Sequence, residues 1–288
     1  MKQTKSIFLI LAASLLLLAG CGSDGGTGGT EGSAGTITMD VADAKPVLPD
    51  GVTNLFITFE EVLVHKAGGG WIPLTLVESP YTIDLLQFYG DNSTELVPPA
   101  ALESGHYTQV RIVVKSATLR IVDGENIEDH TVTIPSENLK TDKQFSFEVE
   151  GGGAVHLTVD FDLSESLVVT DSDGTPSYQL KPVLHLVHTD EAATIHGTIH
   201  DDSFDNMDAE EAIVKVSSAG SEYTKLTVPR TDPEFTVFWL VPNQEYIVQI
   251  DMDPALDNGP EYEETVNPVV LQAGETYELN GGAEILMP

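Results

Sequence analysis

Two groups of aspartates have the residue types and spacing of a calcium site. Asp160 and Asp162 alternate along the chain, so in an extended segment they share one face. Asp251, Asp253 and Asp257 make up a second, oxygen-rich segment. Calcium takes about 6–8 oxygen ligands, and extracellular modules bind it weakly. These five aspartates are therefore candidate calcium ligands, and no other cofactor is expected.

The surroundings of Asp160 and Asp162 allow two interpretations. In the first, one of them meets Asp40 or Asp43 near the ends of strands and forms a set of oxygen ligands. In the second, the carboxylates belong to a solvated strand face. Neither group of aspartates follows the D-x-[DN]-x-[DN]-G spacing of a calcium loop, so the spacing alone leaves both interpretations open.

Motifs that carry catalysis are missing from the sequence. The chain contains no G-x-S-x-G, H-E-x-x-H or Walker A motif, and no G-x-G-x-x-G on a strand–helix turn. Histidines gather between His185 and His200, but His196 and His200 would lie about 13 Å apart on a strand, too far to share one zinc ion. We expect a non-enzymatic protein. The alternative is an envelope hydrolase with its site between two domains.

The charge of the chain excludes one class of partner. The 288 residues include 13 Lys and Arg against 46 Asp and Glu, a formal net charge of −33. A protein that binds nucleic acid by neutralising phosphates needs basic patches, so no nucleic-acid partner is expected. Self-repulsion of this size favours a soluble monomer.

Two sets of alternating segments predict an all-β chain. In the first set, Leu55, Ile57 and Phe59 alternate with polar residues, and the segments around Ile112 and Leu157 repeat that pattern. A period of two with β-branched and aromatic residues is typical of half-buried strands. Thr82 to Tyr89 and Pro99 to Leu102 are candidates for single helical turns.

A second strand set begins near Ala193, after a polar segment that includes Thr189, Asp190 and Glu191. We therefore predict two antiparallel β-sandwich domains, residues 36–188 and residues 193–288. The acidic stretch from Asp201 to Glu211 would separate the first two strands of the second domain.

The N-terminal residues have the features of an export signal. Lys2 and Lys5 precede an apolar run over residues 7–18, which is shorter than the roughly 20 residues that span a bilayer. The run ends in Leu18-Ala19-Gly20-Cys21, and Cys21 is the only cysteine. Seven glycines then occur among the 14 residues 22–35, a composition typical of a flexible tether.

This segment resembles a bacterial lipoprotein signal peptide with its lipobox. The resemblance implies that residues 1–20 are removed and that Cys21 is lipidated, with residues 21–35 as the anchor and linker. Because Gly22 rather than Asp follows the cysteine, the resemblance favours the outer membrane. The membrane is thus an expected partner, through the N-terminal lipid.

Residues 35–187 resemble the bacterial lipoprotein module known as domain of unknown function 4382. The motifs that carry the resemblance are Gly35-Thr36-Ile37, Val41-Ala42-Asp43-Ala44, Val62-Leu63-Val64-His65, Trp71-Ile72-Pro73-Leu74, Asp84-Leu85-Leu86, the run from Leu102 to Arg111, Val159-Asp160-Phe161-Asp162 and Leu180-Lys181-Pro182-Val183. The chain departs from the family pattern at Ala42 and Lys45, where the family has Thr and Pro. The resemblance implies fold and location rather than chemistry.

The C-terminal part resembles carboxypeptidase-regulatory-like, prealbumin-type sandwiches. The resemblance rests on the run from Thr194 to Ile199, the run from Ala212 to Val216 and the run from Phe235 to Val248. Asn243 stands where that family has Gly, and Asn tolerates the same left-handed turn. Taken together, the sequence predicts a lipid-anchored cell-envelope protein for surface binding, adhesion or envelope scaffolding, with an unidentified extracellular or periplasmic ligand.

Overall fold

The computed structural model describes residues 33–287 except 44–47, 49–50, 137, 141–144, 173–174, 208, 219–220, 253–258 and 268–269. The chain divides into two compact units, Met1–Glu31 and Gly32–Pro288. The first unit, which contains Cys21 and the predicted signal peptide, lies outside the described residues. Within the described part, no helix is long and apolar enough to cross a membrane.

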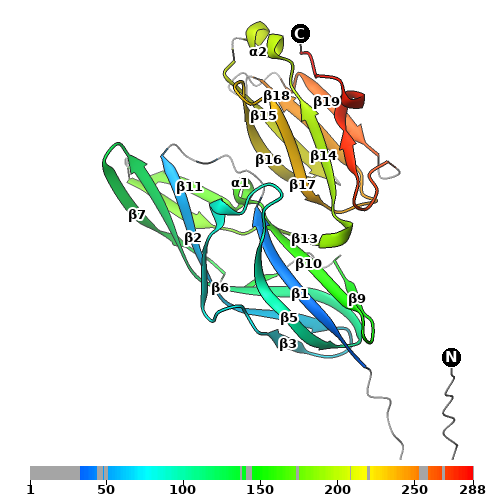
Figure 1. Cartoon of the computed structure of the whole chain (residues 1–288). Helices are drawn as coiled ribbons and strands as arrows, with labels where there is room; N and C mark the ends of the chain where they lie inside the picture. Colours follow the sequence, from blue (N-terminus) through cyan, green and yellow to red (C-terminus); the bar gives the residue numbers. More distant parts are fainter. Residues whose placement is uncertain are drawn as a thin grey trace, which may run out of the picture. The chain divides into compact units, whose positions relative to one another are not determined.

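The prediction of an all-β fold is confirmed. In its described residues, the first part of the second unit contains thirteen strands, one 3₁₀ turn and one short helix, and Figure 1 shows their arrangement. In chain order they are β1 (Ala34–Asp43), β2 (Val52–Lys66), β3 (Trp71–Leu74), β4 (Tyr81–Asp84), η1 (Leu85–Gln87), β5 (Thr94–Glu103), β6 (Gly105–Asp123), β7 (Asn126–Thr133), β8 (Asn138–Lys140), β9 (Phe147–Val149), β10 (Ala154–Phe161), α1 (Leu163–Ser166), β11 (Leu167–Ser172), β12 (Thr175–Leu180) and β13 (Leu184–His188).

These strands form two sheets that enclose a core. One sheet has the order β13-β10-β1-β5, and the other has the order β11-β12-β7-β6-β2-β3, with β4 paired to β2 and with β8 and β9 paired to β6. Most neighbouring pairs are antiparallel, but β1 runs parallel to β10 and β12 runs parallel to β7. The parallel β1–β10 pair brings the carboxyl ends of both strands to the same edge.

The alternation in the sequence decides which side chains fill the core. Ile37, Met39 and Val41 of β1 are fully buried, and they face Leu55, Ile57 and Phe59 of β2 in one hydrophobic cluster. Phe59 and Phe161 meet edge to face with ring centroids 6.0 Å apart, which joins the two sheets.

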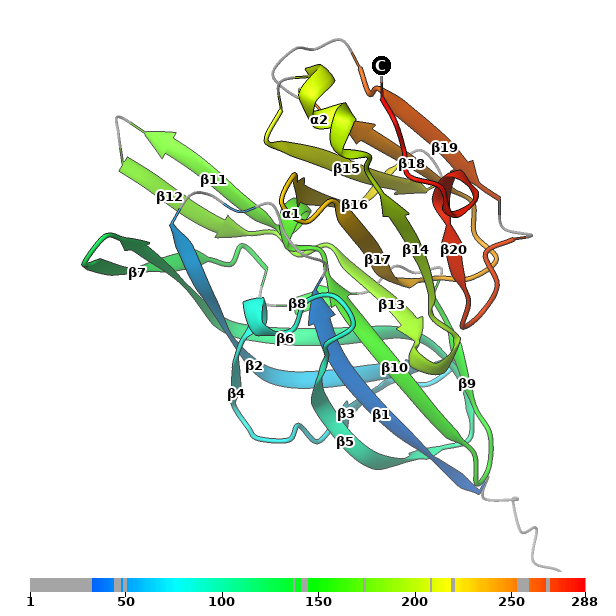
Figure 2. The same cartoon turned by 45° about the horizontal axis from the view of Figure 1, so that its top comes forward.

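The C-terminal part forms a second pair of sheets, ordered β17-β14-β20 and β16-β15-β18-β19 (Figure 2). Its elements are η2 (Thr189–Glu191), β14 (Ala193–Thr198), α2 (Asp201–Met207), β15 (Glu211–Ser218), β16 (Ser221–Pro229), β17 (Glu234–Leu240), β18 (Tyr246–Asp251), β19 (Tyr262–Val266), β20 (Thr276–Glu278) and η3 (Leu279–Gly282). Its buried apolar residues make a hydrophobic cluster of their own, which begins at Ala193.

Two residues show why this second core closes as it does. A Cβ on Gly197 would lie 2.7 Å from the ring of Phe235, so only glycine fits at that point of β14. Asn243 has φ 58°, the left-handed turn expected for it from the sequence.

Three local expectations had different outcomes. The segment from Thr82 to Tyr89 contains the single turn η1, as predicted. Pro99 to Leu102 is not a helical turn but part of β5, where proline is tolerated because β5 is an edge strand. The acidic stretch after Asp201 does separate β14 from β15, and it does so as the short helix α2.

Candidate functional site

Three aspartates lie together at one end of the first sandwich. The register of β1 with β10 pairs Ala42 with Asp160 and Asp43 with Phe161, and Asp162 follows at once. Asp43 and Asp162 have no exposed surface, and Asp160 is 2% exposed. The interpretation of Asp160 and Asp162 as a solvated face is therefore wrong. The chain folds back over the strand ends through α1 and through the loop after η1, and this covering buries the carboxylates.

The loop contacts fix Asp43 firmly in place. The Asp43 backbone N–H donates to the carbonyl of Phe88 at 2.8 Å, and its carbonyl accepts from the N–H of Gly90 at 3.2 Å. Its side-chain Oδ1 accepts from the N–H of Leu163 at 3.1 Å. Its Oδ2 is buried with no hydrogen-bond partner among the described residues.

The surroundings of Asp43 disfavour its negative charge. Burial raises the pKa of the Asp43 carboxyl well above its ordinary value, and the neighbouring Asp160 and then Asp162 add repulsion in the same direction. The hydrogen bond from the N–H of Leu163 lowers that pKa, but it offsets only part of the increase. Asp43, Asp160 and Asp162 are here called the acid cluster. Because a proton on Asp43 relieves the repulsion among them, the acid cluster can hold a proton at a pH above the usual range of a carboxyl.

The calcium hypothesis stays a prediction. Across the described ranges, no group of three or more His, Cys, Asp or Glu side chains has an arrangement that could hold a metal ion. Asp251 ends β18 and is half-buried, while Asp253 and Asp257 lie outside the described residues. The structure thus brings Asp160 and Asp162 to Asp43, as one interpretation of the sequence anticipated, without testing an ion.

Asp40 belongs to a different polar group. Its Oδ2 lies 3.1 Å from Nε2 of His156 and accepts a hydrogen bond from the hydroxyl of Ser93 at 3.0 Å. In the register of β1 with β10, Asp40 stands opposite Thr158, two positions before the pair of Ala42 and Asp160.

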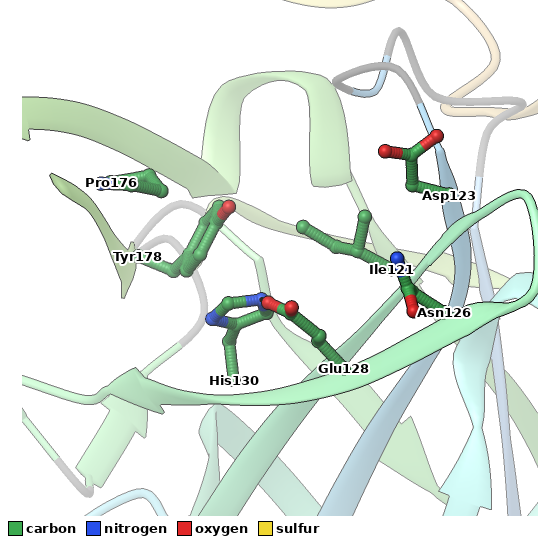
Figure 3. Close-up of a pocket in the computed structure, with 7 residues that line it drawn as sticks. All are labelled: Ile121, Asp123, Asn126, Glu128, His130, Pro176 and Tyr178. Atoms are coloured by element: carbon green, nitrogen blue, oxygen red, sulfur yellow. Dashed lines mark ion pairs between the residues drawn. The ribbon is translucent and has the colours of Figure 1, made fainter. Parts of the chain in front are cut away.

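A second candidate site is a recess between β7 and β12 that sequence reasoning missed. It has a volume of about 260 Å³. Figure 3 shows side chains from β7 and from β12 that project into a common space. The residues that line the β7–β12 recess are Ile121, Asp123, Asn126, Glu128, His130, Pro176 and Tyr178.

The recess lies where one sheet extends beyond the core. Leu119, Val132 and Leu180 are buried on the inner face of β6, β7 and β12. The next positions on that face are Ile121, His130 and Tyr178, and the positions beyond those, Asp123, Glu128 and Pro176, are exposed. The face therefore passes from buried to exposed positions within two residues of each strand. The recess lies at this boundary.

The recess combines an apolar wall with carboxylates. The rings of His130 and Tyr178 lie 5.2 Å apart at an angle of 58°. Nε2 of His130 lies 3.5 Å from a carboxylate oxygen of Glu128. Asp123 supplies a second carboxylate, and no Lys or Arg is among the lining residues. The arrangement suits recognition of a polar or cationic group with an apolar stem.

A further recess of about 280 Å³ lies between the loop at Tyr89 and Gly90 and the strands β16 and β17. The indole N–H of Trp239 donates to the carbonyl of Gly90 at 2.9 Å beside it. Its described lining contains no Ser, Cys or His. The hydrolase alternative needs a site between the two parts. The described lining of this recess supplies no Ser or Cys paired with a His for such a site.

The histidines singled out in the sequence are distributed over several contacts. His196 Nδ1 lies 2.7 Å from a carboxylate oxygen of Glu278, and His200 Nε2 lies 3.5 Å from one of Glu284. The ring of His188 lies 5.9 Å from that of Phe145. His185, His188 and His196 are polar positions on β13 and β14, as expected, whereas His200 follows β14 and is not part of a strand.

Comparison with known proteins identifies the first part of the chain. A family model described as domain of unknown function DUF4382 matches residues 34–182, which is 149 of the 288 residues. The chain belongs to the DUF4382 family. The resemblance noted over residues 35–187 is thereby confirmed. The acid cluster and the β7–β12 recess both lie inside the DUF4382 match, whereas β13 to β20 lie beyond it.

Solved structures give only weak likenesses. The TIE protein of Bacillus anthracis is 8% identical with a TM-score of 0.24, and the match covers 91% of this chain and 59% of that one, less than two thirds of its length. The fimbrial anchor protein Mfa2 of Porphyromonas gingivalis is 12% identical with a TM-score of 0.19, over 80% of this chain and 82% of that one. A putative cell adhesion protein of Parabacteroides distasonis is 11% identical with a TM-score of 0.20, over 89% and 94%. At such scores we base no conclusion on these likenesses, and no curated protein matches the chain.

Proposed function

We propose that this DUF4382 protein is anchored to the cell envelope by a lipid on Cys21 and binds a ligand there without transforming it. Adhesion and envelope scaffolding are the roles that such binding would serve, and the outer membrane is the favoured location. The lipobox and the glycine-rich segment after it support the anchor. We also propose that residues 193–288 form a prealbumin-type accessory domain.

The observation that carries the binding role is the β7–β12 recess. It is a solvent-open hollow beside a core that is filled by apolar side chains. Its seven lining residues include aromatic, amide and carboxylate groups, the usual means of orienting a ligand. They include no Ser, Thr or Cys that could act as a nucleophile.

A binding array tests the proposal. The mature chain, residues 21–288, is applied in detergent to arrays of glycans and peptides, with and without calcium. We expect retention of one ligand class in intact form. Cleavage of the retained ligand would support the hydrolase alternative instead. Unchanged retention of the ligand by a Tyr178→Ala variant would remove the recess from the proposal. Tyr89→Ala is the matched control, because it also removes an aromatic ring but lies outside the recess.

A further inference from the structure

The open edges beside the recess point to an extended partner. We propose, on the basis of the binding role above, that the β7–β12 recess takes a lysine- or arginine-bearing peptide segment, which adds as a strand along β7 and places its cation between Asp123 and Glu128. The argument rests on the sheet topology, the charge of the lining and the size of the hollow.

The sheet topology leaves a wedge between two strands. β7 pairs with β6 from Ala117 with Val132 to Asp123 with Asn126. Its pairing with β12 consists of two positions only, Val132 with Tyr178 and Thr133 with Gln179. In the described part of the chain, residues 126–131 of β7 therefore have no neighbouring strand on that side. Such an edge presents backbone N–H and C=O groups to an added strand.

The lining of the recess selects for a cation. Asp123 and Glu128 face it, and its described lining contains His130 but no Lys or Arg. The nearby guanidinium of Arg120 is held on the opposite face by Asp129, with two hydrogen bonds of 2.7 and 2.8 Å. The whole chain adds a net charge of −33, which attracts a basic partner at long range.

The size and the apolar wall favour a side chain over a larger ligand. A volume of about 260 Å³ lies below the range of roughly 300–1,000 Å³ that holds drug-sized molecules. Ile121, Pro176 and Tyr178 can cover the methylene stem of Lys or Arg, while the carboxylates of Asp123 and Glu128 receive its charged head. A second copy of this chain is a poor occupant, because two molecules of charge −33 repel each other.

The probe is a seven-residue, end-capped peptide of alternating Thr and Val with Lys at its centre. Three comparison probes accompany it: the same peptide with norleucine at the centre, the same peptide with alternate backbone nitrogens methylated, and N-acetyl-lysine methylamide. Binding to the mature chain is measured by calorimetry at low salt, and backbone protection is measured by hydrogen exchange. We expect the Lys peptide to bind about tenfold more tightly than each comparison probe and to protect amides within residues 126–131.

The variants separate the recess from general acidity. Asp123→Asn/Glu128→Gln should weaken binding of the Lys peptide about tenfold, because the variant removes both carboxylates that receive the cation. Asp232→Asn/Glu234→Gln removes the same charge beside the other recess and should leave affinity within about twofold.

Four results would overturn the proposal. The norleucine peptide could bind as tightly as the Lys peptide, or the methylated peptide or N-acetyl-lysine methylamide could do so. The Asp123→Asn/Glu128→Gln variant could bind the Lys peptide as tightly as wild type, or sedimentation could show a dimer whose formation blocks peptide binding. If the array yields a ligand whose retention survives the recess variant, the envelope-binding role stands while this inference fails.

Discussion

Removing one buried hydroxyl tests how the second core is held. Tyr246 is fully buried in β18, and its hydroxyl accepts from the N–H of Val241 at 3.1 Å and donates to the carbonyl of the same residue at 3.2 Å. Tyr246→Phe deletes this oxygen and leaves the ring in place. A buried polar group that loses its partner costs about 1–3 kcal/mol. For a domain of about 100 residues, that lowers the melting temperature by roughly 5–15 °C.

Two other tyrosines calibrate the effect. The hydroxyl of the fully buried Tyr107 donates to the carbonyl of Glu103 at 2.8 Å, so Tyr107→Phe removes one such bond, for about 0.5–1.5 kcal/mol. Tyr89 is 46% exposed, and Tyr89→Phe should change stability by less than about 0.5 kcal/mol. The expected order of destabilisation is therefore Tyr246, then Tyr107, then Tyr89.

Calorimetry of the mature chain gives a second readout from the same variants. The buried apolar residues form two clusters, one over β1 to β13 and one over β14 to η3. We expect two transitions, with Tyr107→Phe lowering one and Tyr246→Phe lowering the other. Equal shifts from Tyr246→Phe and Tyr89→Phe would refute the hydrogen-bond reasoning. A single transition lowered by both buried variants would refute independent folding of residues 36–188 and 193–288.

Three further predictions concern the anchor, the aspartates and pH. Cys21→Ser should release the protein from the membrane fraction and abolish palmitate incorporation, and labelled palmitate in the variant would contradict the lipobox assignment. Calcium at about 5 mM should stabilise the chain by about 2.3 kcal/mol if it binds with a dissociation constant near 10⁻⁴ M. The shift is measured against magnesium at matched ionic strength, in wild type and in Asp160→Ala/Asp162→Ala and Asp251→Ala/Asp253→Ala, and equal shifts from the two ions would remove the calcium site. Because the pKa of Asp43 is raised in the folded state, the folded chain binds the extra proton, and the stability from that proton is lost as pH rises from about 4 through the folded pKa. Denaturant unfolding of Asp43→Asn should therefore show a gain over wild type that grows with pH across that window, and a constant difference would contradict the raised pKa.

Local patterns in the sequence predict the elements and the core well. The alternation around Leu55 and Ile57 identifies the inner face of β2 because every second residue of a half-buried strand must be apolar. The left-handed turn at Asn243 also follows from local chemistry. The prediction of a helical turn at Pro99 is wrong because a local pattern does not reveal which strand lies at an edge of its sheet.

Both candidate sites depend on pairings that the sequence does not encode locally. Asp43 and Asp160 are more than a hundred residues apart, and only the parallel register of β1 with β10 brings them together. The recess left a weaker trace: residues 126–131 of β7 are polar at almost every position, which is a pattern of a strand that extends beyond its core. That signal identifies an uncovered strand, but the position of β12 beside it comes only from the fold.

The buried polar residues are distributed unequally between the two parts of the chain. Among the described residues, all three buried charged side chains, Asp43, Asp160 and Asp162, lie in the DUF4382 part, and the C-terminal part buries only the neutral Ser203, Ser218 and Thr224. A buried carboxylate cluster and an uncovered inner sheet face both reduce stability, and natural proteins retain such departures mainly at functional sites. Because both departures occur in the same sandwich, they support placing the proposed ligand recognition in the DUF4382 part. A chain lacking β14 to η3 should then keep peptide binding wherever its first sandwich stays folded.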